Sequence, residues 1–248
     1  ANHAMVRSWM VSLVDQGLDP RSVNRKTACL RSFYKFLLKQ QVISADPTRK
    51  LVALKASKKL PQFLNENTIN YLLDNAAFED TFTGWRDKLI LELLYNTGTR
   101  LSEIINLKES DVNLTNGTIK VIGKRNKERI IPFSKSLIAV IDGYQKSKKR
   151  SISQNDNAFL IVTDTGDQCY PMLVYRTVKK YLNLFTTIEK RSPHVLRHTF
   201  ATHLLNKGAE LNAVKDLLGH SSLAATQVYT HNSMDKLKAA FDQAHPKA

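Results

Sequence analysis

The chain has 248 residues, of which 42% are hydrophobic. This is enough apolar material to bury a core, and it excludes a chain that is disordered throughout. Lysine and arginine total 37 against 22 acidic residues, which gives a formal net charge of +15 and a pI near 9.8. Such an excess favours a polyanionic partner, with an acidic lipid surface or a generally basic proteome as the alternatives until a site accompanies the charge.

The two cysteines, Cys29 and Cys169, lie far apart and show neither a CxxC motif nor a metal-ligand spacing. This usage is typical of a reducing, intracellular setting and predicts no metal site. No stretch approaches the roughly 18 apolar residues of a membrane span, and the first residues lack the pattern of a signal peptide. We therefore expect a soluble, cytoplasmic protein.

The first part of the chain predicts two helices. An amphipathic stretch covers residues 5–15 and stops before Gly17, while Asp19 and Pro20 supply the cap and first-turn residue of a second helix that extends to about residue 40. The apolar side chains expected to pack in the second helix recur at helical spacing: Val23, Leu30, Phe33, Leu37 and Leu38. Three cations step by four along another face: Arg31, Lys35 and Lys39. This stripe suits a DNA backbone or is a solvated face, and both interpretations stay open.

A basic interdomain linker is predicted over residues 57–62, where Lys58 and Lys59 precede Pro61 and the apolar period is lost. The linker separates a helical domain, residues 1–56, from a larger domain, residues 63–248.

The larger domain is predicted to be mainly α with a small antiparallel β-sheet. Helical patterns cover these stretches: 67–75, 85–96, 172–184 and, after Ser192, a series of short helices that ends with 234–241. Strands are expected at 118–122, 129–133 and 159–163. The first two strands are joined by a polar turn that carries Lys124, Arg125 and Lys127. This turn makes a hairpin with a positive tip.

A candidate phosphate site begins at Ser192. Ser192 and Pro193 predict the start of a helix capped by the serine, and His194 and Arg197 share a face in its first turns. Free backbone N–H groups, an imidazole and a guanidinium together suit a phosphate. This HxxR pattern alone is weak, because any capped surface helix with an incidental histidine produces it. A metal site at His194 and His198 is disfavoured because no third ligand is apparent.

Three further segments make the pattern specific: Thr97–Glu103, Leu217–Ser222 and Thr226–His231. Together with the HxxR pattern, these segments resemble the motifs of the tyrosine recombinase family, most closely the bacterial Xer recombinases of the XerC and XerD type. The resemblance covers the chain from about Leu60 to its C-terminus and, less distinctly, the helical region before it. Each motif is common by itself, whereas their order and spacing together are not.

The resemblance implies a tyrosine recombinase catalytic fold preceded by a partial helical DNA-clamp domain. It also implies six catalytic residues: Arg100, Lys124, His194, Arg197, His220 and Tyr229. In the family, the tyrosine attacks a DNA phosphodiester to give a 3′-phosphotyrosyl link and a free 5′-hydroxyl, and a 5′-hydroxyl from a partner strand then reseals the DNA. No metal, ATP or other cofactor is expected.

The residue types suit this reaction on physical grounds. Two permanently charged guanidiniums, on Arg100 and Arg197, can clamp the negative charge that builds on the phosphate oxygens. His194 is suited to accept the proton of the tyrosine, and Lys124 to protonate the departing 5′-oxygen. His220 would donate a hydrogen bond to the phosphate.

Two assignments within and around this set rest on different grounds. Glu103, three residues after Arg100, is expected to orient its guanidinium. The resemblance favours Lys124 over the other cations of its turn, because its place after Gly123 matches that of the family's catalytic lysine, although the sequence does not say which side chain reaches the phosphate. The candidate DNA contacts are Arg31, Lys35, Lys39, Lys58, Lys59, Arg125, Lys127 and His231.

The resemblance further implies a homo- or hetero-tetramer on two short double-stranded DNA sites. Chromosome dimer resolution during cell division is the favoured role, with a septal DNA translocase as a partner. The final helix, residues 234–241, would dock into a neighbouring protomer or pack on its own domain. The N-terminal domain is shorter than the family's, so we expect it to be truncated.

Three alternatives stay open. A mobile-element integrase would carry the same six residues, and a DNA-binding protein that has lost catalysis would keep the fold. A type IB topoisomerase would share the nucleophile but relax supercoils without pairing two sites.

Overall fold

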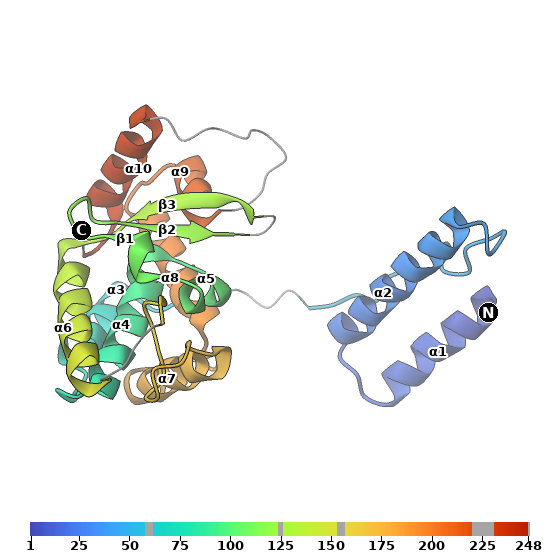
Figure 1. Ribbon diagram of the computed structural model, residues 1–248. Helices are drawn as coiled ribbons and strands as arrows, with labels where there is room; N and C mark the ends of the chain where they lie inside the picture. The colour runs from blue at the N-terminus through green and yellow to red at the C-terminus, as the bar shows by residue number, and fades with distance from the viewer. Residues whose placement is uncertain (58–61, 124–125, 153–156, 220–230, 248) are drawn as a thin grey trace. The chain divides into compact units, whose positions relative to one another are not determined.

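The computed structural model divides the chain into two compact units, Ala1–Leu60 and Pro61–Ala248, and each unit has a hydrophobic core of its own (Figure 1). The division falls within the predicted linker, residues 57–62. The residues that the structure describes are 1–57, 62–123, 126–152, 157–219 and 231–247, with the backbone but not the side chains for 231–236. The prediction of a mainly helical chain with a small antiparallel sheet is confirmed.

The first unit contains two helices, α1 (His3–Asp15) and α2 (Pro20–Lys39), as the sequence predicted. The chain leaves α1 through Gly17, whose φ of +78° is a left-handed conformation that glycine adopts without strain. The Asp19 carboxylate then accepts a hydrogen bond from the Arg21 backbone N–H at 3.0 Å. This cap, followed by proline at the first helical position, fixes the start of α2.

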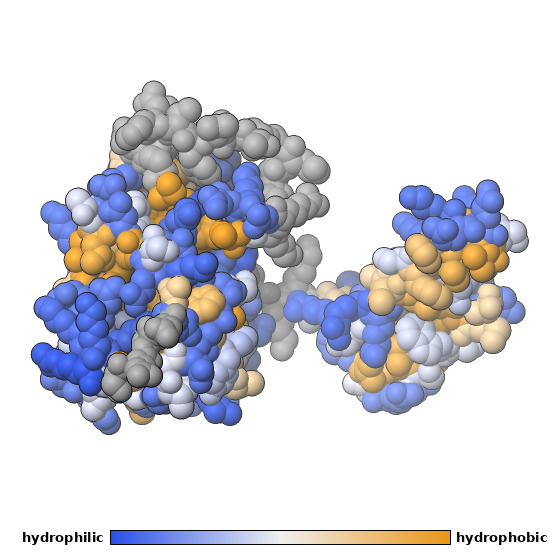
Figure 2. All heavy atoms as spheres, in the orientation of Figure 1, coloured by the Kyte–Doolittle hydropathy of each residue, from blue (hydrophilic) through white to orange (hydrophobic). Residues whose placement is uncertain are grey.

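The core of the first unit is small, and its buried hydrophobic residues are Val6, Met10, Leu13, Val23 and Leu51. The prediction that Phe33 and Leu38 pack in this core was wrong, because their exposed fractions are 53% and 41%. Helical periodicity shows that a face is apolar but not whether another element covers it. Figure 2 shows apolar surface, in orange, on this unit.

The second unit is built around α4 (Phe82–Thr97), in which 13 of 16 residues are buried. A helix buried on every side needs neighbours all round. These neighbours include α3 (Glu66–Asn75), α6 (Lys135–Ser151), α7 (Pro171–Phe185) and α8 (Pro193–Asn206). The predicted helices at residues 67–75, 85–96 and 172–184 are confirmed as α3, α4 and α7, with ends within three residues of those expected.

The sheet has three antiparallel strands in the order β1 (Val112–Asn113), β2 (Thr118–Ile122) and β3 (Glu128–Pro132). The predicted hairpin is thus confirmed, and its register pairs Val121 with Arg129. A third predicted strand, residues 159–163, was wrong, because this stretch forms only isolated bridges from Phe159 to Lys108 and from Val162 to Gln168. Leu160, Ile161 and Val162 are buried in the core, and a short apolar run of this kind is common to strands and to any other buried segment.

Three helices complete the unit, namely α5 (Leu101–Ile105), α9 (Leu211–Leu218) and α10 (His231–Ala244). Both α9 and α10 contact β3 and α8, and they lie beside the sheet (Figure 1). Leu237 and Phe241 of α10 are buried in the core of this same unit, which is the second of the two arrangements that the sequence left open. Within the described part of the chain, no helix combines the length and apolarity that crossing a bilayer requires.

We predict that Gly98→Ala destabilises the second unit by about 2–5 kcal/mol, combining a left-handed backbone with overpacking. Gly98 ends α4 at φ +57°, and an added Cβ would lie 2.4 Å from Cδ1 of the buried Phe200 ring. Gly208→Ala is the matched control, since Gly208 has φ +87° but no atom near an added Cβ, so only the backbone cost of about 1–2 kcal/mol applies. Urea unfolding followed by circular dichroism measures both, and equal losses would show that the contact with Phe200 is unimportant.

Candidate active site

Of the predicted catalytic and supporting residues, the structure describes four: Arg100, Glu103, His194 and Arg197. Other predicted residues lie outside the described part of the chain, and for His231 this holds for the side chain only: Lys58, Lys59, Lys124, Arg125, His220, Tyr229 and His231. The described four all belong to the second unit, where α4, α5 and α8 position them.

Arg100 follows the turn at Gly98 and forms the N-cap of α5. Its Nη1 donates to Oε1 of Glu103 at 2.8 Å, and its backbone N–H donates to Oε2 of the same carboxylate at 2.7 Å. The contact expected between these two side chains is therefore present. The Arg100 side chain is 26% exposed and that of Glu103 only 2%, so the cation lies on the solvent side of the carboxylate.

Arg197 approaches the same region from α8. Its Nη2 donates to the carbonyl oxygen of Leu218 at 2.7 Å, and its Nη1 donates to the carbonyl oxygen of Gly98. Burial and, after it, the charge of Arg100 lower the pKa of Arg197 to about 10, so the guanidinium stays charged at neutral pH. The expected convergence of Arg100 and Arg197 is thus present in the folded chain.

A third arginine, Arg129 of β3, joins Arg100 and Arg197 around Glu103, and these four side chains form the arginine cluster. No role was predicted from the sequence for Arg129. Its Nη1 and Nη2 donate to Oε1 and Oε2 of Glu103 at 2.7 and 2.8 Å, and its Nε donates to the carbonyl oxygen of Leu217 at 2.8 Å. The alternation of β3 offered a signal, because Arg129 shares the inward face of the strand with Ile131. A charged residue at an inward position needs a buried partner, and here the partner is Glu103.

The C-terminal end of α9 is where the three arginines meet. Arg129 donates to the carbonyl of Leu217, Arg197 to that of Leu218 and Arg100 to that of Gly219, the last at 2.9 Å. The final carbonyls of a helix have no partner within the helix, and the helix dipole makes this end negative, so cations stabilise it. The next residue in the chain is His220.

The electrostatics of the cluster are set by three guanidiniums around one carboxylate. Burial alone would raise the pKa of Glu103, but the hydrogen bond and charge of Arg129, together with the hydrogen bonds from Arg100, lower it to about 2. Glu103 is therefore ionised at neutral pH, and an excess of two positive charges remains among these four side chains. Such a centre suits an anion with several oxygens, such as a phosphodiester.

His194 lies next to Pro193 at the start of α8, where the sequence placed it. Its side chain is exposed whereas that of Arg197 is nearly buried, at 9%, so the two differ in their access to solvent. Ser192 is the N-cap of α8 and Pro193 its first residue, as predicted. The Ser192 side chain makes no capping hydrogen bond, and the Ser192 carbonyl accepts one from the Val195 N–H. His198 packs edge-on against the ring of Phe63, as befits a packing residue.

The described DNA-contact candidates differ in exposure. Lys35, Lys39 and Lys127 are exposed. Arg31 is half-buried and donates a hydrogen bond to the carbonyl of Leu51, so part of its role is to hold the segment after α2.

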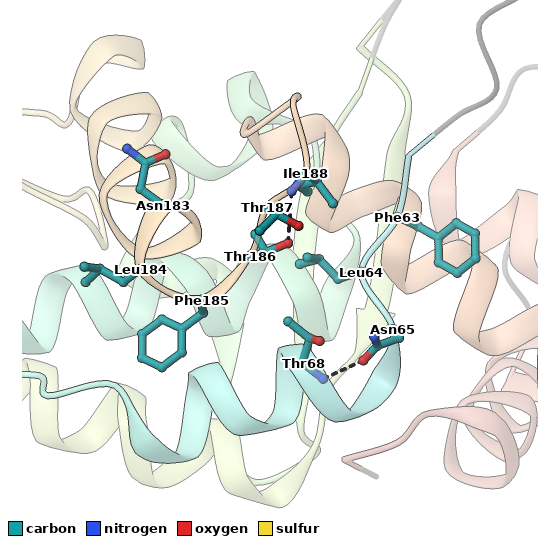
Figure 3. A pocket seen from close by; sticks show the side chains of 10 residues that line it. All are labelled: Phe63, Leu64, Asn65, Thr68, Asn183, Leu184, Phe185, Thr186, Thr187 and Ile188. Carbon is teal, nitrogen blue, oxygen red and sulfur yellow. Dashed lines mark hydrogen bonds between the residues drawn. The ribbon is translucent and has the colours of Figure 1, made fainter.

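A cavity of about 520 Å³ lies apart from the arginine cluster, between the start of α3 and the end of α7 (Figure 3). None of the described residues that line it is charged: Phe63, Leu64, Asn65, Thr68, Asn183, Leu184, Phe185, Thr186, Thr187 and Ile188. Asn65 caps α3 by accepting a hydrogen bond from the Thr68 N–H at 2.7 Å. Within the described part of the chain, the cavity therefore has no charged group with which to hold a phosphate.

We predict that Glu103→Gln lowers the free energy of unfolding by about 3 kcal/mol at pH 7, because it leaves buried guanidiniums without a charged partner. A carboxylate with a lowered pKa contributes stability that is complete above its unfolded pKa, near 4.5, and is lost as the pH falls through about 2. The difference between the two proteins should shrink accordingly as the pH falls.

Urea unfolding at a series of pH values measures this difference. Glu66→Gln is the control, because Glu66 forms an ion pair with Lys207 in which both side chains are 38% exposed, worth about 0–1 kcal/mol. A Glu103→Gln effect that stays constant down to pH of about 2.5 would contradict the role given to the ionised carboxylate.

Comparison with known proteins places the chain in a family. Residues 62–236 match the phage integrase family, and residues 1–41 match the N-terminal SAM-like domain of phage integrases. The tyrosine recombinase XerC of Chlorobaculum parvum is 40% identical over 265 residues, which covers 99% of this chain and 79% of that relative. The tyrosine recombinase XerD of Staphylococcus haemolyticus is 38% identical over 245 residues, covering 98% of this chain and 82% of that relative.

Solved structures share the fold. The XerH site-specific recombinase in a post-cleavage complex with palindromic difH substrate has a TM-score of 0.77 at 24% identity, over 97% of this chain and 71% of that one. The family match covers more than half of the chain, and the curated relatives extend over nearly all of it. The chain therefore belongs to the phage integrase family of tyrosine recombinases, enzymes that break and rejoin DNA.

Proposed function

We propose that this chain is a site-specific recombinase in which Tyr229 attacks a DNA phosphodiester and forms a 3′-phosphotyrosyl intermediate. The observation that carries the proposal is the convergence of Arg100 and Arg197 at the end of α9, directly before His220. The family match extends through residue 236 and so includes Tyr229.

In the proposed reaction, Arg100 and Arg197 hold the non-bridging oxygens of the scissile phosphate. Each guanidinium carries five N–H groups, and partners within the described part of the chain engage only some of them. Both side chains stay charged during the reaction, and clamping the extra negative charge of the transition state is the largest contribution expected of them.

The proton transfers fall to other residues. The Tyr229 oxygen forms a bond to phosphorus while its proton passes to His194, and the bond from phosphorus to the 5′-oxygen breaks as Lys124 protonates that oxygen. His220 donates a hydrogen bond to the phosphate. Religation reverses these steps with a 5′-hydroxyl of the partner strand, so the bond energy is kept in the phosphotyrosine and no ATP is consumed.

We predict that Tyr229→Phe abolishes covalent attachment to DNA, because it removes the attacking oxygen. A pool of labelled, nicked suicide duplexes with a randomised core is incubated with the full chain, and covalent complexes are separated on a denaturing gel. Arg197→Lys should slow their formation about 10²–10³-fold, the usual cost of losing one transition-state donor.

Tyr170→Phe is the matched control, since Tyr170 is 45% exposed and caps α7 through its backbone, so the covalent complex should be retained. DNA binding by the wild-type chain without any covalent complex would favour a DNA-binding protein that has lost catalysis. Relaxation of supercoiled DNA that requires no particular site would favour a topoisomerase.

We further propose the Xer role, namely resolution of chromosome dimers by a homo- or hetero-tetramer on two short DNA sites, in the cytoplasm and in response to a septal DNA translocase. The identities of 40% and 38% to proteins named XerC and XerD support it. The excess of positive charge across the chain suits binding to the DNA backbone. A mobile-element integrase of the same family is the second candidate.

The Xer role predicts one preferred site near the replication terminus of the host chromosome. Duplexes tiled across that region are tested for binding and cleavage, with duplexes of equal length from elsewhere as controls. The preferred duplex should bind at least about 10³-fold more tightly than the controls at physiological salt. Uniform binding across the terminus, together with cleavage at the ends of a mobile element, would instead favour the integrase.

A further inference from the structure

Arg129 is a buried cation that the reaction proposed above does not use. Its side chain is 4% exposed, so it has no surface with which to contact DNA. It projects from β3, whose register pairs it with Val121 on β2, next to the turn that joins the two strands. Any influence of Arg129 on the reaction must therefore pass through other side chains or the backbone.

The contacts of Arg129 lead to two parts of the candidate site. Through Glu103 it reaches Arg100, because both oxygens of that carboxylate accept hydrogen bonds from both arginines. Through the carbonyl of Leu217 it holds the end of α9, from which the chain continues to His220. The Arg129 guanidinium thus contacts both the partner of Arg100 and the C-terminal end of α9.

We propose that Arg129 is a positioning residue for strand cleavage: it holds Glu103, and through it Arg100, in register with the end of α9, so that Arg100 and Arg197 grip the same phosphate. This role rests on the proposed function. Arg129 fixes the direction in which the Arg100 guanidinium points, whereas Arg100 itself makes the contact with DNA.

The geometry demands an arginine. Three hydrogen bonds leave Arg129 in one plane, two to Glu103 and one to Leu217, and a lysine ammonium cannot reproduce this fork. Space is also restricted, because a Cβ on Gly219 would lie 3.0 Å from Nη1 of Arg129. Without Arg129, the Glu103 carboxylate would keep Arg100 as its remaining described guanidinium partner and draw it inward, away from a phosphate. A displacement of about 1 Å in a catalytic group can cost on the order of 10²-fold in rate.

The test measures single-turnover cleavage at saturating DNA by the full chain, on a suicide duplex recovered in the covalent selection. Two duplexes are compared, one with a normal scissile phosphate and one with a methylphosphonate, which lacks a charged non-bridging oxygen. Arg129→Met removes the fork, and Arg129→Lys keeps the charge and most of the chain length, so it provides a folded variant if Arg129→Met fails to fold.

Arg86→Met is the matched control. Arg86 is likewise 4% exposed and bonds to a carboxylate, Asp164 at 3.0 Å, and to a backbone carbonyl, that of Val162, but it has no described contact with the arginine cluster. Loss of either buried arginine is expected to lower the Tm. Only loss of Arg129 should change how the reaction depends on the charge of the phosphate.

We expect both Arg129 variants to cleave the normal duplex about 10–100-fold more slowly than wild type with unchanged DNA affinity, and the methylphosphonate duplex less than about threefold more slowly. Equal losses on the two duplexes, as expected for Arg86→Met, would show that Arg129 is merely structural, and a wild-type rate for Arg129→Lys would overturn the need for its fork. A wild-type chain that forms no covalent complex would overturn the proposed function, and this inference with it. A wild-type chain that cleaves normally, with equal losses for Arg129→Met on the two duplexes, would overturn this inference alone.

Discussion

The C-terminal end of α9 is held by arginine side chains from three other elements of the second unit. The carbonyls of Leu217, Leu218 and Gly219 each accept a hydrogen bond from a different arginine, on β3, on α8 and at the start of α5. Gly219, the left-handed C-cap of α9, bonds through its N–H to the carbonyls of Asp216 and Lys215, and the carbonyls that follow in a helix end are usually left to water. Because they bind side chains here, the packing that completes the fold also assembles the cluster of cations, and the two are expected to be lost together.

The position of the single carboxylate explains how this cluster can be both stable and available to an anion. A buried group of cations is unfavourable unless an opposite charge accompanies it, and the lowered pKa of Arg197 reflects that cost. Glu103 supplies the opposite charge from the inside, where it is screened from an approaching phosphate by Arg100. The folded chain thus retains a local excess of positive charge, a cost in stability of the kind that functional sites commonly carry.

Local signals in the sequence predicted most of the helices, because caps and left-handed glycines act within one turn. Asp19 with Pro20 and the turn at Gly98 are examples. The contact between Arg100 and Glu103 also followed from spacing on one helix. Predictions failed where a distant element decides the outcome: nothing local reveals that Phe33 stays uncovered or that the Phe159 stretch forms bridges instead of a strand. The alternation of β3 indicates that Arg129 faces inward, but its role depends on partners in α5 and α9, which no local pattern identifies.

The close fit between Gly219 and Arg129 has a consequence for how sequences of this kind can diverge. Glycine at position 219 satisfies a φ of +63° and also leaves the volume that the Arg129 guanidinium fills. A larger residue at 219 is therefore compatible only with a smaller or displaced side chain at 129, which would give up the hold on Glu103. Across natural variants, positions 219 and 129 should therefore covary although they lie far apart in the chain. A glycine directly before His220 then predicts an arginine at the position of Arg129 on β3.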